Sequence, residues 1–238
     1  MRSVYDGHMT VTAVDLFAGP GGWDVAAREL GIRTIGIELD HFACATRRAA
    51  GLATVEGSVT DHRPGEFGAD GLIGSPPCQS FSIAGNGSGR RSMDEVLAAV
   101  KSLELDTTHN LHTADPRTAL VVEPLRWAMM AFDETLPFRW IVLEQVPTVV
   151  PVWEACAEVL RRLGYSVVVG TLNAEQYGVP QTRKRAVLIA RLDDEALMPA
   201  PTHSRLHSRD PRRGKQHEQI GNAVPPLLAH AILSTIHV

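Results

Sequence analysis

The sequence predicts an α/β fold built on a doubly wound, mostly parallel sheet, and three observations support this prediction. Short apolar stretches typical of strands recur along the chain, at residues 12–17, 33–38, 53–56, 70–74, 139–144, 165–172 and 184–191. Helical stretches lie between several of them, as in proteins that alternate strands and helices. A length of 238 residues suits one domain with a sizeable core. We therefore expect a single domain over residues 1–238.

The composition argues against several classes of protein. No apolar run reaches the roughly 18 residues of a membrane span, and no basic-then-apolar start indicates a secretory signal. Cys44, Cys78 and Cys156 lack a paired spacing, which suits a reducing compartment. No metal site is expected, because the histidines of residues 108–112 have no acid or cysteine at ligand spacing.

The first predicted strand leads into a glycine-rich turn that ends at Gly22, and a helix is predicted at residues 23–30. Glycines allow the backbone to approach a ligand held at a helix N-terminus. This pattern fits many nucleotide-binding proteins and also some turns that bind nothing. The second strand ends near Glu38, about twenty residues after the turn, a spacing that suits a carboxylate bound to ribose hydroxyls. The alternative is a solvated acid at a strand end.

Cys78 follows Pro76 and Pro77 just after the predicted strand at residues 70–74. The prolines stiffen the turn, and open α/β sheets bind ligands at the carboxyl ends of their strands. The thiol is therefore a candidate nucleophile. The alternative is a small buried cysteine that only fills space.

Six motifs occur in order along the chain. They are residues 15–22 (Asp-Leu-Phe-Ala-Gly-Pro-Gly-Gly), 77–79 (Pro-Cys-Gln), 117–126, 142–146 (Val-Leu-Glu-Gln-Val), 172–185 (ending Gln-Thr-Arg-Lys-Arg) and 219–226. Together they resemble the DNA (cytosine-5) methyltransferases, which use S-adenosylmethionine. The resemblance extends from residue 12 to the end of the chain. It implies a Rossmann-like class I methyltransferase fold and methyl transfer to C5 of cytosine in DNA.

The resemblance also implies a role for each catalytic residue. Cys78 attacks C6 of the cytosine, which makes C5 nucleophilic. Glu144 is the acid that hydrogen-bonds or protonates N3. Arg185 holds O2 and orients this acid, and Arg183 lies near a backbone phosphate or the catalytic loop. Because C5 and C6 are unreachable in a stacked duplex, the base must be flipped into the pocket.

The cofactor contacts are implied in the same way. Phe17 lies against the adenine, Gly19 and Gly22 lie near the ribose and methionine, and Glu38 binds the ribose hydroxyls. The remaining residues assigned to the cofactor pocket are Leu39, Ser58, Pro77, Leu120, Asn222 and Val224.

Two positions depart from the family pattern. Ser58 stands where the family often has an acid that accepts from the adenine amino group, and a hydroxyl is a weaker acceptor. Asp61 is a nearby acid that could substitute, although it lies three residues further on. Gln145 replaces the usual Asn after the catalytic acid, and no role for it follows from the sequence. These changes leave open the transfer of a group other than methyl from a modified cofactor.

The segment available for target recognition is short. The family usually has many tens of residues between the fifth and sixth motifs, whereas here only residues 191–218 lie there, too few for a separate core. Its stretch 203–217 carries five basic residues against one acid, Asp210, although the formal net charge of the chain is −4, so we predict a phosphate contact. The alternative is a solvated loop. The basic residues assigned to DNA are Arg205, Arg209, Arg212, Arg213 and Lys215.

A second candidate for DNA binding is an insertion at residues 84–116, after the catalytic motif. It begins with a glycine-rich stretch that carries Arg90 and Arg91, and apolar residues at helical spacing follow from Met93 to Leu105. An added helix that contacts DNA and an ordinary packed insertion both remain open. Gln79 and Ser82, beside the cysteine, are further candidates for DNA contact.

The leading interpretation is a DNA cytosine-5 methyltransferase that acts on double-stranded DNA as a monomer in the cytoplasm of a bacterium, encoded by the bacterium or by a phage. A separate partner could supply sequence recognition. One alternative is an RNA cytosine-5 methyltransferase on the same fold. Another is a non-catalytic member that binds DNA or acts as a scaffold. The presence of all four predicted catalytic residues argues against this second alternative.

Overall fold

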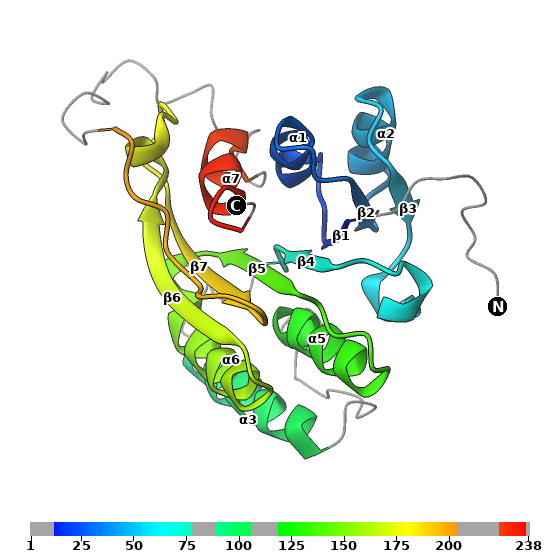
Figure 1. The fold of residues 1–238 in the computed structure, drawn as a ribbon, viewed down its shortest axis with the longest axis vertical. Helices are drawn as coiled ribbons and strands as arrows, with labels where there is room; N and C mark the ends of the chain where they lie inside the picture. The colour runs from blue at the N-terminus through cyan, green and yellow to red at the C-terminus, as the bar shows by residue number, and fades with distance from the viewer. Residues whose placement is uncertain (1–11, 78–88, 106–118, 204–223, 237–238) are drawn as a thin grey trace.

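The computed structural model describes residues 12–77, 89–105, 119–203 and 224–236, with the backbone alone for residues 89–92 and 104–105. A seven-stranded sheet forms its centre, in the order β3-β2-β1-β4-β5-β7-β6 (Figure 1). Strands β1 to β5 are parallel, and β7 runs antiparallel to both of its neighbours. The bounds are β1 (Ala13–Leu16), β2 (Thr34–Glu38), β3 (Thr54–Glu56), β4 (Gly71–Gly74), β5 (Trp140–Gln145), β6 (Ser166–Asn173) and β7 (Lys184–Arg191).

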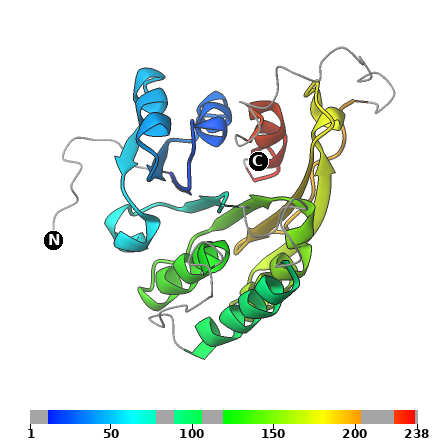
Figure 2. The ribbon, with the colours of Figure 1, turned by 180° about the vertical axis from the view of Figure 1, so that it is seen from behind.

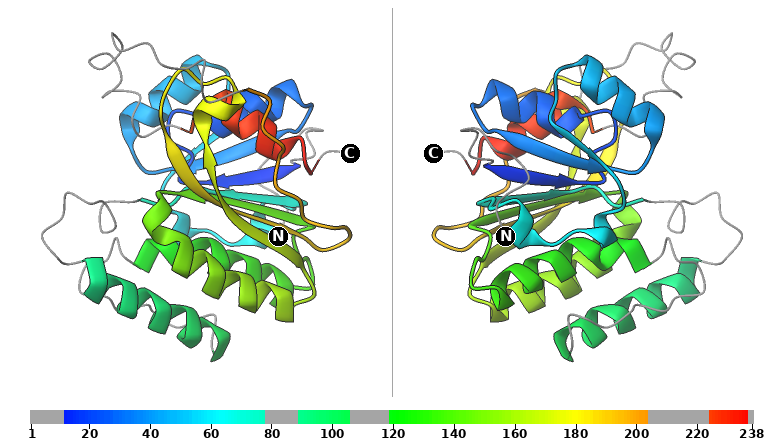
Figure 3. Two further views of the ribbon diagram at one scale, coloured as in Figure 1. Left: turned by 90° about the vertical axis from the view of Figure 1, so that its left-hand side faces the viewer. Right: turned by 90° about the vertical axis from the view of Figure 1, so that its right-hand side faces the viewer.

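Helices cover both faces of the sheet (Figures 1 and 2). One face carries α1 (Gly22–Glu29), α2 (His41–Ala49) and α7 (Pro226–Leu233). The other carries α5 (Glu123–Asp133) and α6 (Val150–Arg162), with α3 (Gly89–Leu105) packed against the outside of α6 (Figure 3). Short 3-10 turns lie at Val59–Asp61, Pro64–Glu66, Leu120–Val122, Pro147–Val149 and Ala174–Tyr177.

The predicted fold class is confirmed, and each of the seven predicted strands is present to within one residue at either end. The helix predicted from Met93 to Leu105 is also present as α3. Its Val96, Val100 and Leu103 are buried in the core on the α5 and α6 side, which explains their helical spacing. In the described part of the chain, no helix is both long and apolar enough to cross a membrane.

The strand register gathers the ends of several strands at one edge of the sheet. Leu16 of β1 is level with Ile37 of β2 and with Gly74 of β4, and Gly74 is level with Leu143 of β5. The residues that follow these positions therefore leave the sheet side by side. Because β7 is antiparallel, its first residues lie at the same edge.

Candidate active site

Glu144 lies near the end of β5 in a closely enclosed position. Glu144 is only 5% exposed, and its Oε1 atom lies 2.6 Å from Arg185 Nε. Burial raises the pKa of this carboxyl group, while Arg185, Arg183 and a hydrogen bond from the Ser75 side chain act in the opposite direction. The net shift is upward, so the protonated form is more accessible than for a glutamate in water.

The motif that ends in Arg183 and Arg185 reaches this acid through the start of β7. The backbone N–H of Ala174 donates to the carbonyl of Arg183 at 2.8 Å, which ties the segment before β7 to the end of β6. Arg183 is buried and its charge acts on Glu144. The structure thus brings together three of the four residues predicted to be catalytic. The fourth, Cys78, lies outside the described residues.

Gln145, for which the sequence offered no role, connects β5 to the segment of Pro76 that follows β4. Its side-chain Nε2 donates to the carbonyl of Pro76 at 2.5 Å, and its Oε1 accepts from the backbone N–H of Val146. The residue is 4% exposed, so this amide is shielded from water. The side chain, longer than the usual Asn, therefore fits by bridging the end of β5 and the segment of Pro76. We call this bridge the brace.

The sequence analysis missed Trp23 and Ser75. The indole Nε1 of Trp23, the second residue of α1, donates to Ser75 Oγ at 2.9 Å, across 52 positions of sequence. Ser75 is the first residue after β4, and its own N–H donates to the carbonyl of Leu16. The sequence feature that could have identified Ser75 is its hydroxyl, placed between the strand and the two prolines. The interpretation of that segment considered only the neighbouring cysteine.

The glycine-rich turn after β1 has an unusual backbone conformation. Phe17, Gly19 and Gly21 adopt positive φ angles of 59°, 53° and 101°, and such a conformation is uncommon for a residue with a side chain. Among the described residues, no atom outside the immediate chain neighbours lies within 4 Å of a Cβ built on Gly19. The turn therefore leaves open space beside its backbone.

The carboxylate of Glu38 holds this turn through one oxygen and the start of α2 through the other. Oε2 accepts from the N–H of Gly19 and Oε1 from the N–H of Asp40, each at 2.7 Å. The next residue, Leu39, is 71% exposed. An acid with free lone pairs and an exposed apolar side chain thus lie side by side next to the open turn.

Gly22 packs directly against the segment that precedes α7. A Cβ at this position would lie 2.0 Å from the carbonyl oxygen of Val224, which is a backbone atom. Only glycine allows this approach. The two residues, both predicted to line the cofactor pocket, are therefore neighbours although they come from opposite ends of the chain.

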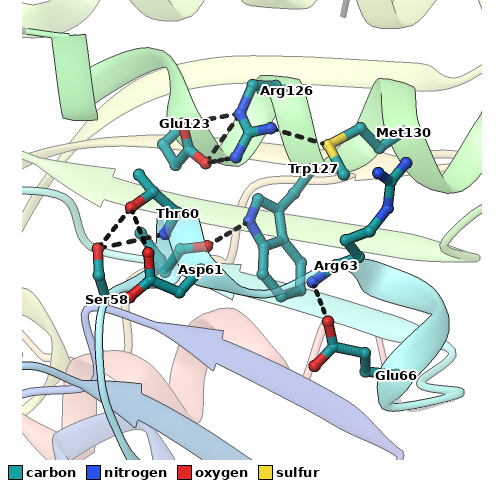
Figure 4. A network of polar contacts seen from close by, with 10 residues as sticks. Ser58, Thr60, Asp61, Arg63, Glu66, Glu123, Arg126, Trp127 and Met130 are labelled. Atoms are coloured by element: carbon teal, nitrogen blue, oxygen red, sulfur yellow. Dashed lines mark hydrogen bonds and ion pairs between the residues drawn. The ribbon is translucent and has the colours of Figure 1, made fainter. Parts of the chain in front are cut away.

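The hydroxyl of Ser58, predicted to accept from the adenine amino group, already forms hydrogen bonds within the protein (Figure 4). Ser58 Oγ lies 2.7 Å from Thr60 Oγ1 and caps the 3-10 turn by accepting from the Thr60 N–H. Asp61 belongs to the same turn, and Trp127 of α5 donates its indole N–H to the carbonyl of Val59. This bond ties α5 to the 3-10 turn that follows Ser58.

A buried ionic cluster lies beneath the glycine-rich turn. Arg47 donates to Asp24 Oδ2 at 2.6 Å and to the carbonyl of Ala18 in the turn at 3.2 Å, and both charged side chains are fully buried. Burial and the neighbouring Asp24 raise the pKa of Asp15 well above its ordinary range, whereas Arg47 lowers it. The cluster supports the turn from below, and the sequence analysis did not identify it.

Several predicted site residues lie outside the described part of the chain. For Arg90 and Arg91 the structure describes only the backbone of α3. The others are Cys78, Gln79, Ser82, Arg205, Arg209, Arg212, Arg213, Lys215 and Asn222. Among the described residues, no group of three His, Cys, Asp or Glu side chains is arranged to hold a metal ion.

Comparisons with known proteins point to one family. The family model for the C-5 cytosine-specific DNA methylase matches residues 11–103 and 133–212. The type II methyltransferase M1.HphI of Haemophilus parahaemolyticus is 30% identical over 216 residues, covering 84% of this chain and 51% of that protein. The type II methyltransferase M.AquIA of Picosynechococcus is 29% identical over 216 residues, covering 80% of this chain and 76% of that protein.

Solved structures show the same fold at lower identity. The S. pombe Dnmt2 methyltransferase is 18% identical, with a TM-score of 0.55 over 79% of this chain and 50% of that one. This chain spans about half the length of the curated relatives it matches first, 51% of M1.HphI and 41% of M.DdeI from Desulfomicrobium norvegicum.

Proposed function

Because the chain belongs to the family of C-5 cytosine-specific DNA methylases, we propose that it transfers a methyl group from S-adenosylmethionine to C5 of cytosine in double-stranded DNA. The observation that carries the proposal is the ion pair of Glu144 and Arg185. This pair lies beside the turn of Pro76, which Gln145 binds directly and which leads to Cys78.

Each residue has a defined task in the proposed reaction. With the base flipped out of the duplex, the Cys78 thiolate forms a bond to C6 while Glu144 gives a proton to N3. The ring electrons then make C5 nucleophilic. Arg185 holds the acid and the O2 atom of the base. After C5 has taken the methyl group, which leaves the cofactor sulfur as a neutral thioether, the C5 proton passes to water and the N3 proton returns to Glu144. Release of the Cys78 thiolate then restores the ring.

The residues at the open turn fit S-adenosylmethionine, the cofactor of this family. The cofactor supplies a methyl group on a positively charged sulfur. The open space beside Gly19 leaves room for the cofactor to lie against the backbone of the turn. Glu38 keeps lone pairs that can accept from ribose hydroxyls. Leu39 presents an exposed apolar surface for the adenine.

Double-stranded DNA is the proposed substrate, bound by a protein that acts as a monomer. Support for individual DNA contacts comes from the sequence alone. The candidates are Gln79 and Ser82 near the cysteine, Arg90 and Arg91 at the start of α3, and the basic residues of segment 191–218.

Mass spectrometry of nucleosides tests the proposal. DNA from cells that lack cytosine methylation of their own should contain 5-methylcytosine after expression of the wild-type chain and none after expression of Cys78→Ser. Purified protein should label duplex DNA and not tRNA when both are offered with labelled cofactor. Preferential labelling of tRNA, or a mass increase larger than a methyl group, would replace the proposed reaction by one of the alternatives.

A further inference from the structure

Ser75 is bonded to the chain on both sides of the glycine-rich turn. Its backbone N–H donates to the carbonyl of Leu16, the residue before the turn, at 3.2 Å. Its Oγ accepts from the indole N–H of Trp23, the residue after the turn, at 2.9 Å. The turn of residues 17–22 therefore lies between two contacts that end on a single residue. We call these two contacts the clamp.

The contact between Trp23 and Ser75 is enclosed and has one direction. Trp23 is 2% exposed and belongs to the same buried apolar cluster as Ile73 and Val224. An indole N–H can only donate, and Ser75 Oγ is its acceptor. Loss of this acceptor would leave a donor unpaired in the core, which costs free energy. The indole and the hydroxyl therefore hold each other in one arrangement.

The residues between Ser75 and the predicted nucleophile have little conformational freedom. Pro76 and Pro77 come next, and each proline ring fixes its own φ and restricts the residue before it. The brace from Gln145 holds the carbonyl of Pro76 at 2.5 Å. Cys78 follows these two prolines directly in the sequence. The segment that leads to Cys78 is thus held from β1 and α1 by the clamp and from β5 by the brace.

The proposed reaction demands a fixed relation between this segment and the turn. Cys78 must bond C6 while C5, the neighbouring ring atom, takes the methyl group from a donor held at the turn. A misplacement of about 1 Å between reacting groups can lower a rate about a hundredfold. We propose that Trp23 is a positioning residue that, through Ser75, aligns the segment of Cys78 with the methyl donor at the glycine-rich turn. This inference rests on the proposed function and identifies residues that set its geometry.

A side reaction of the covalent adduct separates alignment from general damage. Once Cys78 has bonded C6, C5 can take a proton from water in place of the methyl group. Loss of the original C5 hydrogen to water, return of the N3 proton to Glu144 and release of the Cys78 thiolate then regenerate unmodified cytosine. This exchange needs Cys78 and Glu144 but no alignment with the methyl donor. Misalignment should therefore favour exchange over methyl transfer, whereas partial unfolding lowers both alike.

The measurement uses duplex DNA with tritium at C5 of its cytosines and saturating cofactor with a radiolabelled methyl group. Every methyl transfer also releases the C5 hydrogen, so the tritium released per methyl group incorporated is about one plus the exchange. The excess over one should grow roughly two- to tenfold in Trp23→Phe and in Ser75→Ala, the factor for one uncharged hydrogen bond. Ser75→Thr keeps the hydroxyl and should stay close to the wild type. The double variant should exceed neither single variant, because Trp23 acts through Ser75.

Trp127→Phe is the matched control. Trp127 is also a buried tryptophan whose indole N–H donates to an oxygen of the protein, the carbonyl of Val59 at 3.2 Å, but it belongs to α5 on the other face of the sheet. Its substitution removes the same atoms and should leave the excess at the wild-type value, whatever its effect on the two rates. An equal growth of the excess in Trp127→Phe, or a wild-type excess in both Trp23→Phe and Ser75→Ala, would overturn the inference.

A second measurement does not depend on activity. In denaturant unfolding, Trp23→Phe and Ser75→Ala together should cost less stability than the sum of their separate losses, because each removes the same hydrogen bond. The losses from Trp127→Phe and Ser75→Ala should add. If the coupling is found in a protein that neither releases tritium nor incorporates methyl groups, the proposed function fails and the clamp is only structural. If methyl transfer occurs and the losses from Trp23→Phe and Ser75→Ala simply add, the proposed function stands and the role of Trp23 is wrong.

Discussion

At the proposed catalytic acid, burial and two arginines act in opposite directions on one carboxyl group. Glu144 is nearly inaccessible to water, which favours its neutral form, whereas Arg185 and Arg183 favour the anion. The outcome is a carboxyl group with a raised pKa that is held in place by an ion pair. Such a group can both donate a proton to N3 and remain oriented after it has done so.

Gln145 gives a prediction at the same scale. Gln145→Leu keeps the approximate shape of the side chain but leaves the Pro76 carbonyl without its donor, a loss of about 1 to 3 kcal/mol for a buried polar group. The turn before Cys78 should loosen, so the rate at saturating DNA should fall roughly tenfold while cofactor affinity is retained. Single-turnover kinetics and calorimetric cofactor titration measure the two quantities.

The control is Gln145→Asn, which restores the residue type usual in the family and keeps an amide. This variant should lose less activity than Gln145→Leu. A Gln145→Leu protein with wild-type kinetics would show that the brace has no part in catalysis.

At the scale of elements, β7 is the strand that completes the site. Its antiparallel direction brings the start of the strand, with Arg185, to the edge where β5 ends with Glu144 and Gln145. A parallel strand would place this arginine at the opposite edge. The direction of a single strand thus decides whether the acid has its cationic partner.

The sequence predicted the strands well because most of them are short apolar runs with clear boundaries, and β1, β4 and β5 are buried along their whole length. It did not predict the contacts made between them. Trp23 and Ser75 are 52 positions apart, and Asp24 and Arg47 are 23 apart. A periodic pattern records which face of an element is buried, but not which polar side chains meet there.

Gly22 provides the prediction for elements. In Gly22→Ala the added methyl group would overlap the backbone carbonyl of Val224, so α1 and the segment before α7 must separate. We expect a loss of about 1 to 3 kcal/mol in stability, as for other overpacked sites, together with weaker cofactor binding. Thermal unfolding and calorimetric titration measure both.

Gly57→Ala is the matched control, since the nearest atom to its new methyl group is His62 Nε2 at 3.5 Å. It should change neither quantity appreciably. If Gly22→Ala bound the cofactor as tightly as Gly57→Ala, the close approach of α1 and Val224 would have no bearing on the pocket.

At the scale of the whole molecule, one edge of the sheet carries the proposed catalytic residues, and segment 191–218 is the region that the sequence assigns to recognition. Five cations between Arg205 and Lys215 supply attraction to phosphates, and so short a segment is poorly suited to hold several side chains at base edges. We therefore expect a short or degenerate target sequence.

The corresponding prediction concerns salt. Replacing Arg212 and Arg213 by Gln should weaken binding to all DNA sequences alike and reduce the slope of log affinity against log salt by about two. Fluorescence anisotropy over a salt series, with two unrelated duplexes, measures this. Unchanged affinity with a different set of methylated sites would mean that the segment reads bases.

Covalent catalysis by Cys78, assisted by Glu144, is the central claim, and trapping with 5-fluorocytosine tests it most directly. Fluorine at C5 cannot leave as a proton does, so the bond between Cys78 and C6 should persist after methyl transfer. Wild-type protein, duplex DNA and cofactor should give an adduct that survives denaturation and maps to the peptide containing Cys78. Cys78→Ser should give none, and Glu144→Gln should form it at least about 10² times more slowly. Methylated product without an adduct, or an adduct that maps to Cys44 or Cys156, would contradict the account.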